Sequence, residues 1–496
     1  MKKRIAMLLA CVLALSLFAG NAVYAVSDEE GGVGSKWDLG GITLRVFPTD
    51  HFPNPETQDE GRQEEWRERR ALVEEFFNVT LDFGALAGVE YDDVPTVIAQ
   101  SVAAKTHVVD VGNVNTYYLS PLVKAGALVD ITDYAEAEIP SLYWENVGEV
   151  GGKVYAFSDT IPKGFQAIKF NRELIEAAGM RLDPGEMFAA GRWSYDDFIS
   201  YCLELRSKLP EDVNVIGMHP MHFLRLITYS NGTTIVDPST YIPNYTSDDF
   251  MTSLNFFRDL IDQGIWEAPA YTDAEDGTQL ANFDGTGAGF EEGKVAMTIG
   301  HTWEFKAHNE AGMDWGVVPP PWGPNVTLGE AGDYTTLSDE YSGYYKDAAN
   351  LEGIFVGAKD KITPEQFHKM CLMYQGEDAQ EDFETVKALT EAGEKPDLSD
   401  ADAIEWFQTE LDMELWNWYV SRSTPFEPQN FVGDWLTFYE TINKAISTTQ
   451  DPRGVWEAYL PSDLHRISEN GFIDPETLPA AMKAIYDSFT PPEETE

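Results

Sequence analysis

The chain has 496 residues, of which 43% are hydrophobic and 12% aromatic, and its formal net charge at pH 7 is −50. A chain of this length exceeds what one hydrophobic core usually serves, so we expect two or more lobes. The strong acidity argues against nucleic acid and other anions as partners, because their binding requires clustered Lys and Arg. The 13 Trp and 22 Tyr fit either a large core or surfaces that stack on ligands such as sugars.

The first 25 residues have the form of an export signal rather than of folded structure. A basic start at Lys2, Lys3 and Arg4 precedes an apolar run. The segment ends in the small-x-small pattern Val23-Tyr24-Ala25. We predict cleavage after Ala25 and export to the extracellular space or the cell envelope. We expect residues 26–40 to form a flexible lead-in and residues 491–496 a polar tail.

Three cysteines bear on tethering and redox chemistry. Cys11 lies only seven residues after Arg4 and the apolar run continues past it, so we favour a cleaved signal peptide over a lipid anchor at Cys11. Cys202 and Cys371 lie among apolar neighbours in helix-like segments. This setting favours buried free thiols over a disulfide or a catalytic nucleophile.

The N-terminal third alternates between apolar strands and amphipathic helices. Strands are predicted over Ile42–Phe47, Val79–Phe83 and His107–Val111, and a helix over Val94–Ala104. This alternation predicts an α/β lobe with a parallel sheet. Polar and aromatic residues follow the first and third strands, at the ends where ligands bind in open α/β sheets. They are Asp50 and His51, then Asn113, Asn115 and Tyr117.

Several tryptophans are expected to be structural. Trp193 precedes Ser194, an N-cap candidate, and can pack on Phe198 as a hydrophobic staple. For three others we favour core packing over ligand contact; they are Trp315, Trp406 and Trp456.

The segment Phe290–Trp303, FEEGKVAMTIGHTW, is expected to organise the site. A turn at Gly293 leads into a short buried strand, and a polar loop carrying His301, Trp303 and Glu304 follows. We expect this strand to cross between two lobes and to place Trp303 in the cleft between them.

Several segments, taken in order, resemble family 1 of the extracellular solute-binding proteins of ABC importers, which includes maltose-binding protein. The segments are GGKVYAFSD with KFNRELIEAAG, RWSYDDFISYCLEL, FEEGKVAMTIGHTW and DWGVVPPPWGP. The resemblance spans roughly Ile42 to Ser488. It implies a two-lobed type II periplasmic-binding-protein fold, in which each lobe is a mixed sheet flanked by helices and the ligand cleft lies at the hinge. It also implies capture of a sugar or oligosaccharide by a monomer, delivery to ABC permease subunits, no cofactor and no catalysis.

The resemblance implies lobe boundaries and binding residues. Lobe 1 is expected to comprise residues 41–162 and 294–355, and lobe 2 residues 163–293 and 356–490. Trp303, with His301 beside it, matches a sugar-stacking position. The other matched positions lie in polar-contact loops or near stacking aromatics; they are Asp50, His51, Asn113, Asn115, Tyr117, His222, Phe223 and Trp435. Val114 or a neighbour stands where the maltose-binding branch has a Trp, which argues against maltose itself.

These residue types suit a sugar, because aromatic rings cover the apolar faces of a pyranose while carboxylates, amides and imidazoles bind its hydroxyls. Three alternatives remain. A secreted carbohydrate-active enzyme is disfavoured because G-x-S-x-G, H-E-x-x-H and P-loop motifs are missing. A peptide, polyamine or other cation could occupy the same fold. An acidic loop could bind calcium, although its spacing is not that of an EF-hand; it contains Asp273, Glu275, Asp276 and Asp284.

Overall fold

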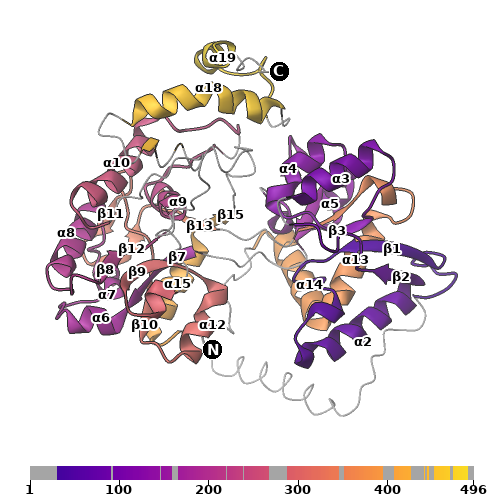
Figure 1. The fold of residues 1–496 in the computed structure, drawn as a ribbon, viewed down its shortest axis with the longest axis horizontal. Helices are drawn as coiled ribbons and strands as arrows, with labels where there is room; N and C mark the ends of the chain where they lie inside the picture. The colour runs from indigo at the N-terminus through magenta and orange to yellow at the C-terminus, as the bar shows by residue number, and fades with distance from the viewer. Residues whose placement is uncertain are drawn as a thin grey trace.

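The described elements of the computed structural model form two α/β lobes, which lie side by side in Figure 1. We call the lobe that contains β1 lobe 1 and the lobe that contains β7 lobe 2. The structure describes residues 31–90, 93–145, 147–158, 166–218, 220–237, 240–266, 288–345, 351–394, 407–425, 441, 444–445, 452–469 and 473–489.

Lobe 1 is built on a five-stranded mixed sheet with the strand order β2-β1-β3-β14-β6. Strand β1 is parallel to β2 and β3, whereas β14 is antiparallel to β3 and β6. The strands are β1 (Ile42–Phe47), β2 (Val79–Asp82), β3 (Val111–Asn113), β6 (Ala156–Ser158) and β14 (Leu351–Ile354), with a small hairpin of β4 (Glu149–Val150) and β5 (Lys153–Val154). The helices are α2 (Glu60–Phe77), α3 (Val94–Ala103), α4 (Thr116–Lys124), α5 (Thr132–Glu138), α13 (Pro364–Gln375) and α14 (Glu377–Glu391).

Lobe 2 is built on a four-stranded mixed sheet with the order β10-β7-β9-β8. Strand β7 is antiparallel to both β10 and β9, and β8 is parallel to β9. The sheet strands are β7 (Gln166–Asn171), β8 (Asn214–Ile216), β9 (Val295–His301) and β10 (Trp315–Val318). Two small pairs accompany them, β11 (Leu328–Glu330) with β12 (Asp333–Leu337), and β13 (Gly343–Tyr345) with β15 (Ser423–Pro425).

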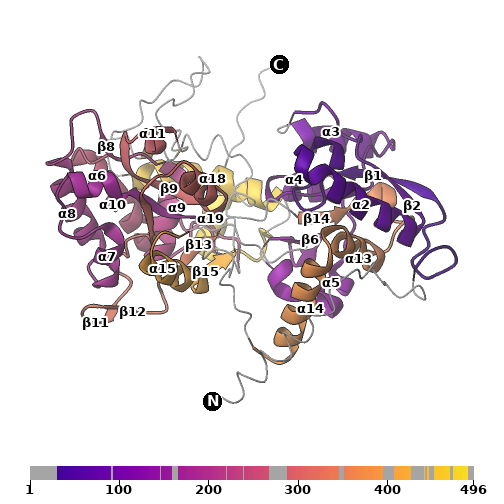
Figure 2. The same ribbon diagram turned by 90° about the horizontal axis from the view of Figure 1, so that it is seen from below.

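Helices surround the lobe 2 sheet, and the C-terminal helices lie along one end of this lobe, as Figures 1 and 2 show. The Trp456 ring of α18 packs on Tyr245 and Phe250 of lobe 2, with ring centroids 4.8 and 5.5 Å apart. The helices are α6 (Arg172–Ala177), α7 (Pro184–Ala189), α8 (Tyr195–Arg206), α9 (Pro220–Ser230), α10 (Asp248–Asp262), α11 (Ala288–Glu291), α12 (Thr302–Glu310), α15 (Glu410–Ser421), α18 (Arg453–Glu469) and α19 (Ala480–Asp487). In the described part of the chain, no helix is both long and apolar enough to span a membrane.

Local signals in the sequence predicted several structural residues correctly. Ser194 and Asp197 form a capping box at the start of α8, and the Trp193 ring packs on Phe198 at 5.2 Å, as a hydrophobic staple requires. Trp193, Trp315 and Trp456 are almost completely buried. Trp406 lies outside the described residues. Cys202 and Cys371 are buried free thiols, as expected.

One predicted strand is shorter than expected. We predicted a strand over His107–Val111, but β3 begins only at Val111. His107 has a φ of +48°, in the left-handed region, where an extended strand does not continue. The Asp110 side chain accepts hydrogen bonds from the Arg45 guanidinium, at 2.8 Å to each oxygen, and from Lys361 Nζ at 2.6 Å. The Asp110 side chain therefore links the residue just before β3 to Arg45 on β1.

The chain first passes between the lobes after β6, because β6 belongs to one sheet and β7 to the other. The predicted second crossing at β9 is wrong. Strand β9 lies inside the lobe 2 sheet, between β7 and β8, and its register places Ile299 opposite Ile168. The chain is in lobe 1 at Ser158 and in lobe 2 at Gln166, back in lobe 1 at Leu351 after Tyr345 of lobe 2, and again in lobe 2 at Phe407 after Glu394 of lobe 1. We call these three changes of lobe the 158–166, 345–351 and 394–407 crossings.

The expected lobe boundaries therefore need correction. Residues 294–345 were assigned to lobe 1, but β9, α12 and β10 lie in lobe 2. Residues 356–394 were assigned to lobe 2, but α13 and α14 pack with lobe 1, where α13 contacts α2. Both errors have one cause. An apolar run such as Val295–Ile299 predicts a buried strand, but it carries no information about the sheet that buries it.

Candidate ligand-binding site

The carboxyl ends of β1 and β3 bring two of the predicted loops together in lobe 1. These strands are parallel neighbours, so the loops that follow them leave the same edge of the sheet. Asn113 connects the two loops, because its Nδ2 donates to the Pro48 carbonyl at 3.4 Å and its Oδ1 accepts from the Asn115 amide at 2.7 Å. Asp50 is exposed and His51 half-buried, which leaves both with surface for a ligand.

Asn115 has a different position from its neighbours. Only 4% of its surface is exposed, so it is nearly buried beneath the loop. Its carbonyl accepts from the backbone amides of Tyr118 and Leu119, in the first turn of α4, at 2.8 and 3.1 Å. The structure therefore gives Asn115 a role in starting α4. The Tyr117 side chain lies outside the described residues.

The loop after β1 is held by a hydrogen bond to a buried carboxylate, Glu352, which we did not predict. The Thr49 hydroxyl donates to Glu352 Oε1 at 2.6 Å and accepts from the Phe52 amide at 2.7 Å. Glu352 lies on β14 and is fully buried. A Glu in an otherwise apolar strand was the available signal. It could not be interpreted, because its partner Thr49 is about 300 residues away in the chain.

In lobe 2 the predicted contact segment begins a helix instead of forming a loop. Strand β9 ends at His301, and α12 starts at the next residue, Thr302. The side chains of His301 and Trp303 lie outside the described residues, as does the whole of Trp435. The described backbone of α12 places Trp303 in the first turn of this helix.

A charged network that we did not predict lies beneath that first turn. Lys169 on β7 is fully buried, and its Nζ lies 2.6 Å from Glu304 Oε2 and 2.7 Å from His308 Nε2. Burial lowers the pKa of Lys169, and the charge of Glu304 opposes this shift. Burial and the Lys169 ammonium both lower the pKa of His308, so this imidazole is neutral at pH 7.

His222 and Phe223 on α9 differ in what they can contact. The Phe223 ring has no exposed surface and packs on Trp266 and Phe257, with centroids 5.1 and 5.3 Å away. The expectation of ligand contact at Phe223 is therefore wrong, because this apolar residue on the inner face of α9 belongs to the core. His222 is half-buried, and its Nδ1 lies 3.3 Å from Nε2 of Gln166, the first described residue after the first crossing.

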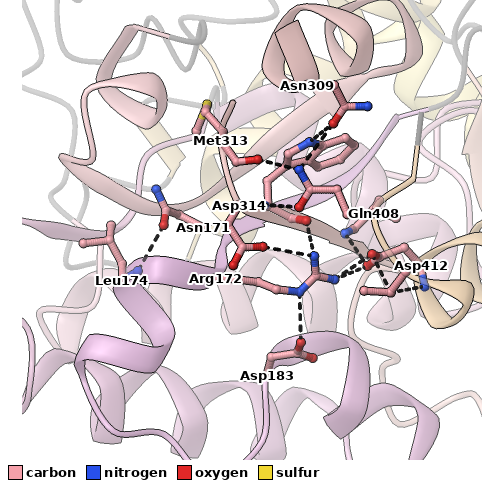
Figure 3. A network of polar contacts seen from close by, with 12 residues as sticks. Asn171, Arg172, Leu174, Asp183, Asn309, Met313, Asp314, Gln408 and Asp412 are labelled. Carbon is pink, nitrogen blue, oxygen red and sulfur yellow. Dashed lines mark hydrogen bonds and ion pairs between the residues drawn. The ribbon is translucent and has the colours of Figure 1, made fainter. Parts of the chain in front are cut away.

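Helix α15 is fastened to the lobe 2 sheet by a buried ion pair, shown in Figure 3. Arg172 Nη2 donates to both carboxylate oxygens of Asp412 at 2.6 Å, and Asp412 is only 2% exposed. The same guanidinium lies 3.4 Å from Asp183 and 3.6 Å from Asp314. Nearby, Gln408 accepts from the Trp315 amide at 3.1 Å. The network thereby holds the segment that enters lobe 2 after the 394–407 crossing.

The acidic loop with Asp273, Glu275, Asp276 and Asp284 lies outside the described residues. Within the part of the chain that the structure describes, no group of three or more His, Cys, Asp or Glu side chains is arranged to hold a metal ion.

The fold and these polar strand ends define a class, the two-lobed periplasmic-type binding proteins. A sequence model of the bacterial extracellular solute-binding proteins matches residues 70–338, more than half of the chain. The chain therefore belongs to the family of bacterial extracellular solute-binding proteins.

Solved structures share the two-lobed fold at low sequence identity. One is the GacH receptor of Streptomyces glaucescens, solved unliganded and with acarbose; it is 15% identical, with a TM-score of 0.51, over 91% of this chain and 100% of that one. The cyclic α-maltosyl-1,6-maltose binding protein of Arthrobacter globiformis is 12% identical, with a TM-score of 0.58, over 87% and 100%. The galacto-N-biose/lacto-N-biose I-binding protein of a Bifidobacterium longum ABC transporter is 15% identical, with a TM-score of 0.55, over 88% and 99%. No curated protein matches the chain in sequence.

Proposed function

We propose that this solute-binding protein captures a sugar or oligosaccharide between its lobes and delivers it to the permease subunits of an ABC importer. The observation that carries the proposal is the meeting of two polar loops at the carboxyl ends of β1 and β3, where Asn113 Nδ2 donates to the Pro48 carbonyl of the loop that continues to Asp50 and His51. Carboxylate, imidazole and amide groups suit the hydroxyl rim of a sugar.

The neighbouring structures support the same ligand class, because the three named above bind acarbose, a cyclic maltosyl-maltose and lacto-N-biose. On this proposal Trp303 stacks on an apolar sugar face from lobe 2, while the loops of lobe 1 bind hydroxyls. A ligand that touches both lobes binds the closed arrangement more tightly and so increases its population. The protein acts as an exported monomer without catalysis, and residues 1–25 direct its export.

A thermal-shift screen tests the proposal. The mature chain from Val26 would be mixed with neutral oligosaccharides (maltotetraose, a cyclodextrin and lacto-N-biose) and, separately, with polyamines and short peptides. A rise of the melting temperature with an oligosaccharide, without new products in the mixture, supports sugar capture. A shift only with polyamines or peptides would replace the sugar by that ligand class, and hydrolysis of the sugar would show an enzyme.

The Trp303→Ala variant tests the stacking position. Removing a buried aromatic from a binding centre costs at least about 2 kcal/mol, so we expect affinity to fall about thirtyfold or more. The melting temperature of the ligand-free protein should remain nearly unchanged. Trp144→Ala is the matched control: this half-buried Trp donates to the Ile139 carbonyl at 3.0 Å in lobe 1, far along the chain from the predicted contacts. If ligand-free Trp303→Ala unfolds instead, Trp303 is a core residue.

A further inference from the structure

Lys169 occupies a position where a lysine is costly. It is the fourth residue of β7, paired with Thr298 of β9 and Val317 of β10, and none of its side chain is exposed. Removing an ammonium from water costs several kcal/mol even when a partner is present, and an apolar side chain of similar length would often give equal or greater stability. The charge at this site therefore calls for an explanation beyond packing.

Gly300 makes room for the Lys169 side chain to reach α12. A Cβ atom added at Gly300 would lie 2.3 Å from both Lys169 Cγ and Cδ, too close for any real contact. The stem therefore runs across the β9 backbone at Gly300, one residue before His301. The glycine in the TIGHTW segment consequently has a spatial reason, since the Lys169 stem fills the volume of the missing side chain.

At the end of this path the ammonium holds one face of α12 at two points. Glu304 and His308 are four residues apart, so they lie one turn above each other on the same face of the helix. Nζ contacts both, at 2.6 and 2.7 Å. An ammonium only donates, so His308 Nε2 accepts and the ring proton sits on Nδ1. Nδ1 faces Glu291 Oε1 of α11 at 3.2 Å.

These contacts determine how α12 is rotated about its axis. Successive residues in an α-helix are separated by about 100° around the axis. With Glu304 and His308 directed at Lys169, the rotation of the helix backbone that carries Trp303, one residue earlier, is fixed. Lys169 also touches the ring of Phe290, with Nζ 5.2 Å from its centroid, so the network includes α11 as well.

We propose that Lys169 is a positioning residue for ligand binding, which sets the rotation of the first turn of α12 and thereby aims Trp303 at the ligand. The inference rests on the proposed function, because it takes Trp303 as the stacking residue. Binding sites require their contact groups to be held within a fraction of an ångström by supporting residues, and a buried ion pair supplies that constraint in a way that an apolar contact does not.

The test is a double-mutant cycle between Lys169→Met and Trp303→Ala, measured by calorimetric titration with the oligosaccharide that gives the largest shift in the screen. Lys169→Met should weaken binding about tenfold in the wild-type background. In the Trp303→Ala background it should have no further effect, because Lys169 acts through Trp303. A merely destabilising substitution would not show this coupling.

Amide hydrogen exchange gives a readout without ligand. Lys169→Met should speed exchange in the first turn of α12 about tenfold, while the amides of β1 and β3 stay unchanged. The matched control is Lys294→Met, in the turn before β9, where Lys294 forms an exposed 2.8 Å pair with Asp212; it should change neither affinity nor exchange. If Lys169→Met does not fold, Glu304→Gln removes the charge from the other side of the pair and should show the same coupling to Trp303.

Two results would overturn the inference. One is wild-type affinity in Lys169→Met or Glu304→Gln; the other is an equal loss in the Trp303→Ala background. Either can occur while the wild-type protein binds the oligosaccharide, so the proposed function would stand. A wild-type protein that binds none of the oligosaccharides defeats the proposed function and this inference together.

Discussion

The two lobes hold their returning segments by different kinds of contact. In lobe 1 the returning segment is β14, which enters the sheet and pairs through its backbone with β3 on one side and β6 on the other. In lobe 2 the segment begins with α15, which docks on the sheet through side chains before the short strand β15 pairs with β13. Its apolar residues Leu415 and Val420 are buried, Asp412 pairs with Arg172, and the Tyr419 hydroxyl donates to the Gln166 carbonyl at 2.8 Å. A backbone ladder tolerates most side-chain changes, whereas a helix that docks through its side chains is sensitive to changes in them.

The difference matters because both segments follow crossings between the lobes. If the lobes close on a ligand, the elements next to the crossings must stay attached to their lobes while the lobes move. We therefore expect single substitutions to loosen lobe 2 more readily than lobe 1, and three measurements address this comparison.

The largest effect is expected for Arg172→Met. It leaves the Asp412 carboxylate buried without its main charge partner, and breaking a buried ion pair from one side costs about 3–5 kcal/mol. Denaturant unfolding should show the loss, and amide exchange should localise it to α15 and β10. The matched control is Arg67→Met, whose exposed pair with Glu56 should contribute nothing measurable. Equal effects of the two substitutions would contradict the comparison.

At acid pH we expect lobe 1, rather than lobe 2, to lose stability first. In lobe 1 His368 is buried against Phe157 and Phe383, with Nδ1 3.0 Å from the Tyr134 hydroxyl, and burial lowers its pKa to about 3. The unfolded chain, with a His pKa near 6.5, then binds the proton more strongly than the folded chain. Stability should therefore be lost as the pH falls below 6.5, by about 2 kcal/mol at pH 5.

His308 of lobe 2 has a lowered pKa as well, but Glu304 and Glu291 favour its charged form and partly offset the shift. The acid-sensitive step should therefore appear first in the amides of α13. His368→Gln should remove this part of the pH dependence without changing the response at α12. Acid loss that begins at α12 would contradict this expectation.

The smallest effect is expected for Thr49→Val in lobe 1. The substitution removes the hydrogen bonds that the hydroxyl makes with Glu352 and Phe52, at 2.6 and 2.7 Å. A net cost of about 1–2 kcal/mol is typical, and the β1, β3 and β14 ladder should keep its protection from exchange. Thr49→Ser, which keeps the hydroxyl, is the control. A loss as large as that of Arg172→Met would show that lobe 1 depends on side chains as strongly as lobe 2.

The comparison also explains what could be predicted from the sequence. Strand β1 was predicted residue for residue, because its apolar run is bounded by turn signals. The capping box of α8 and the cap at Asn171, whose Oδ1 accepts from the Leu174 amide at 3.0 Å, were predictable because the partners lie three residues apart. The sheet that contains β9 was not predictable, because strand pairing is a contact between distant segments.

The candidate site divides in the same way. The loops with Asp50 and Asn113 were predicted as contacts because strand ends in α/β sheets are where ligands bind, and the structure joins the two loops through the Asn113–Pro48 hydrogen bond. Phe223 was misassigned, because an apolar aromatic next to a polar residue looks the same in sequence whether it faces a ligand or the core. Lys169 and Glu352 were missed, because each acquires its meaning from a partner more than 100 residues away.

By itself, the sequence determined the α/β class, the helix starts and the family, all of which depend on periodicity, local capping and the order of motifs. Tertiary structure alone decided which lobe receives β9, α13 and α14, and which buried charges support the predicted contacts. The physical reason is the distance along the chain over which each interaction acts. Backbone preferences and caps act over a few residues, whereas the cost of burying Lys169 or Asp412 is offset only by partners that the fold brings from far along the chain.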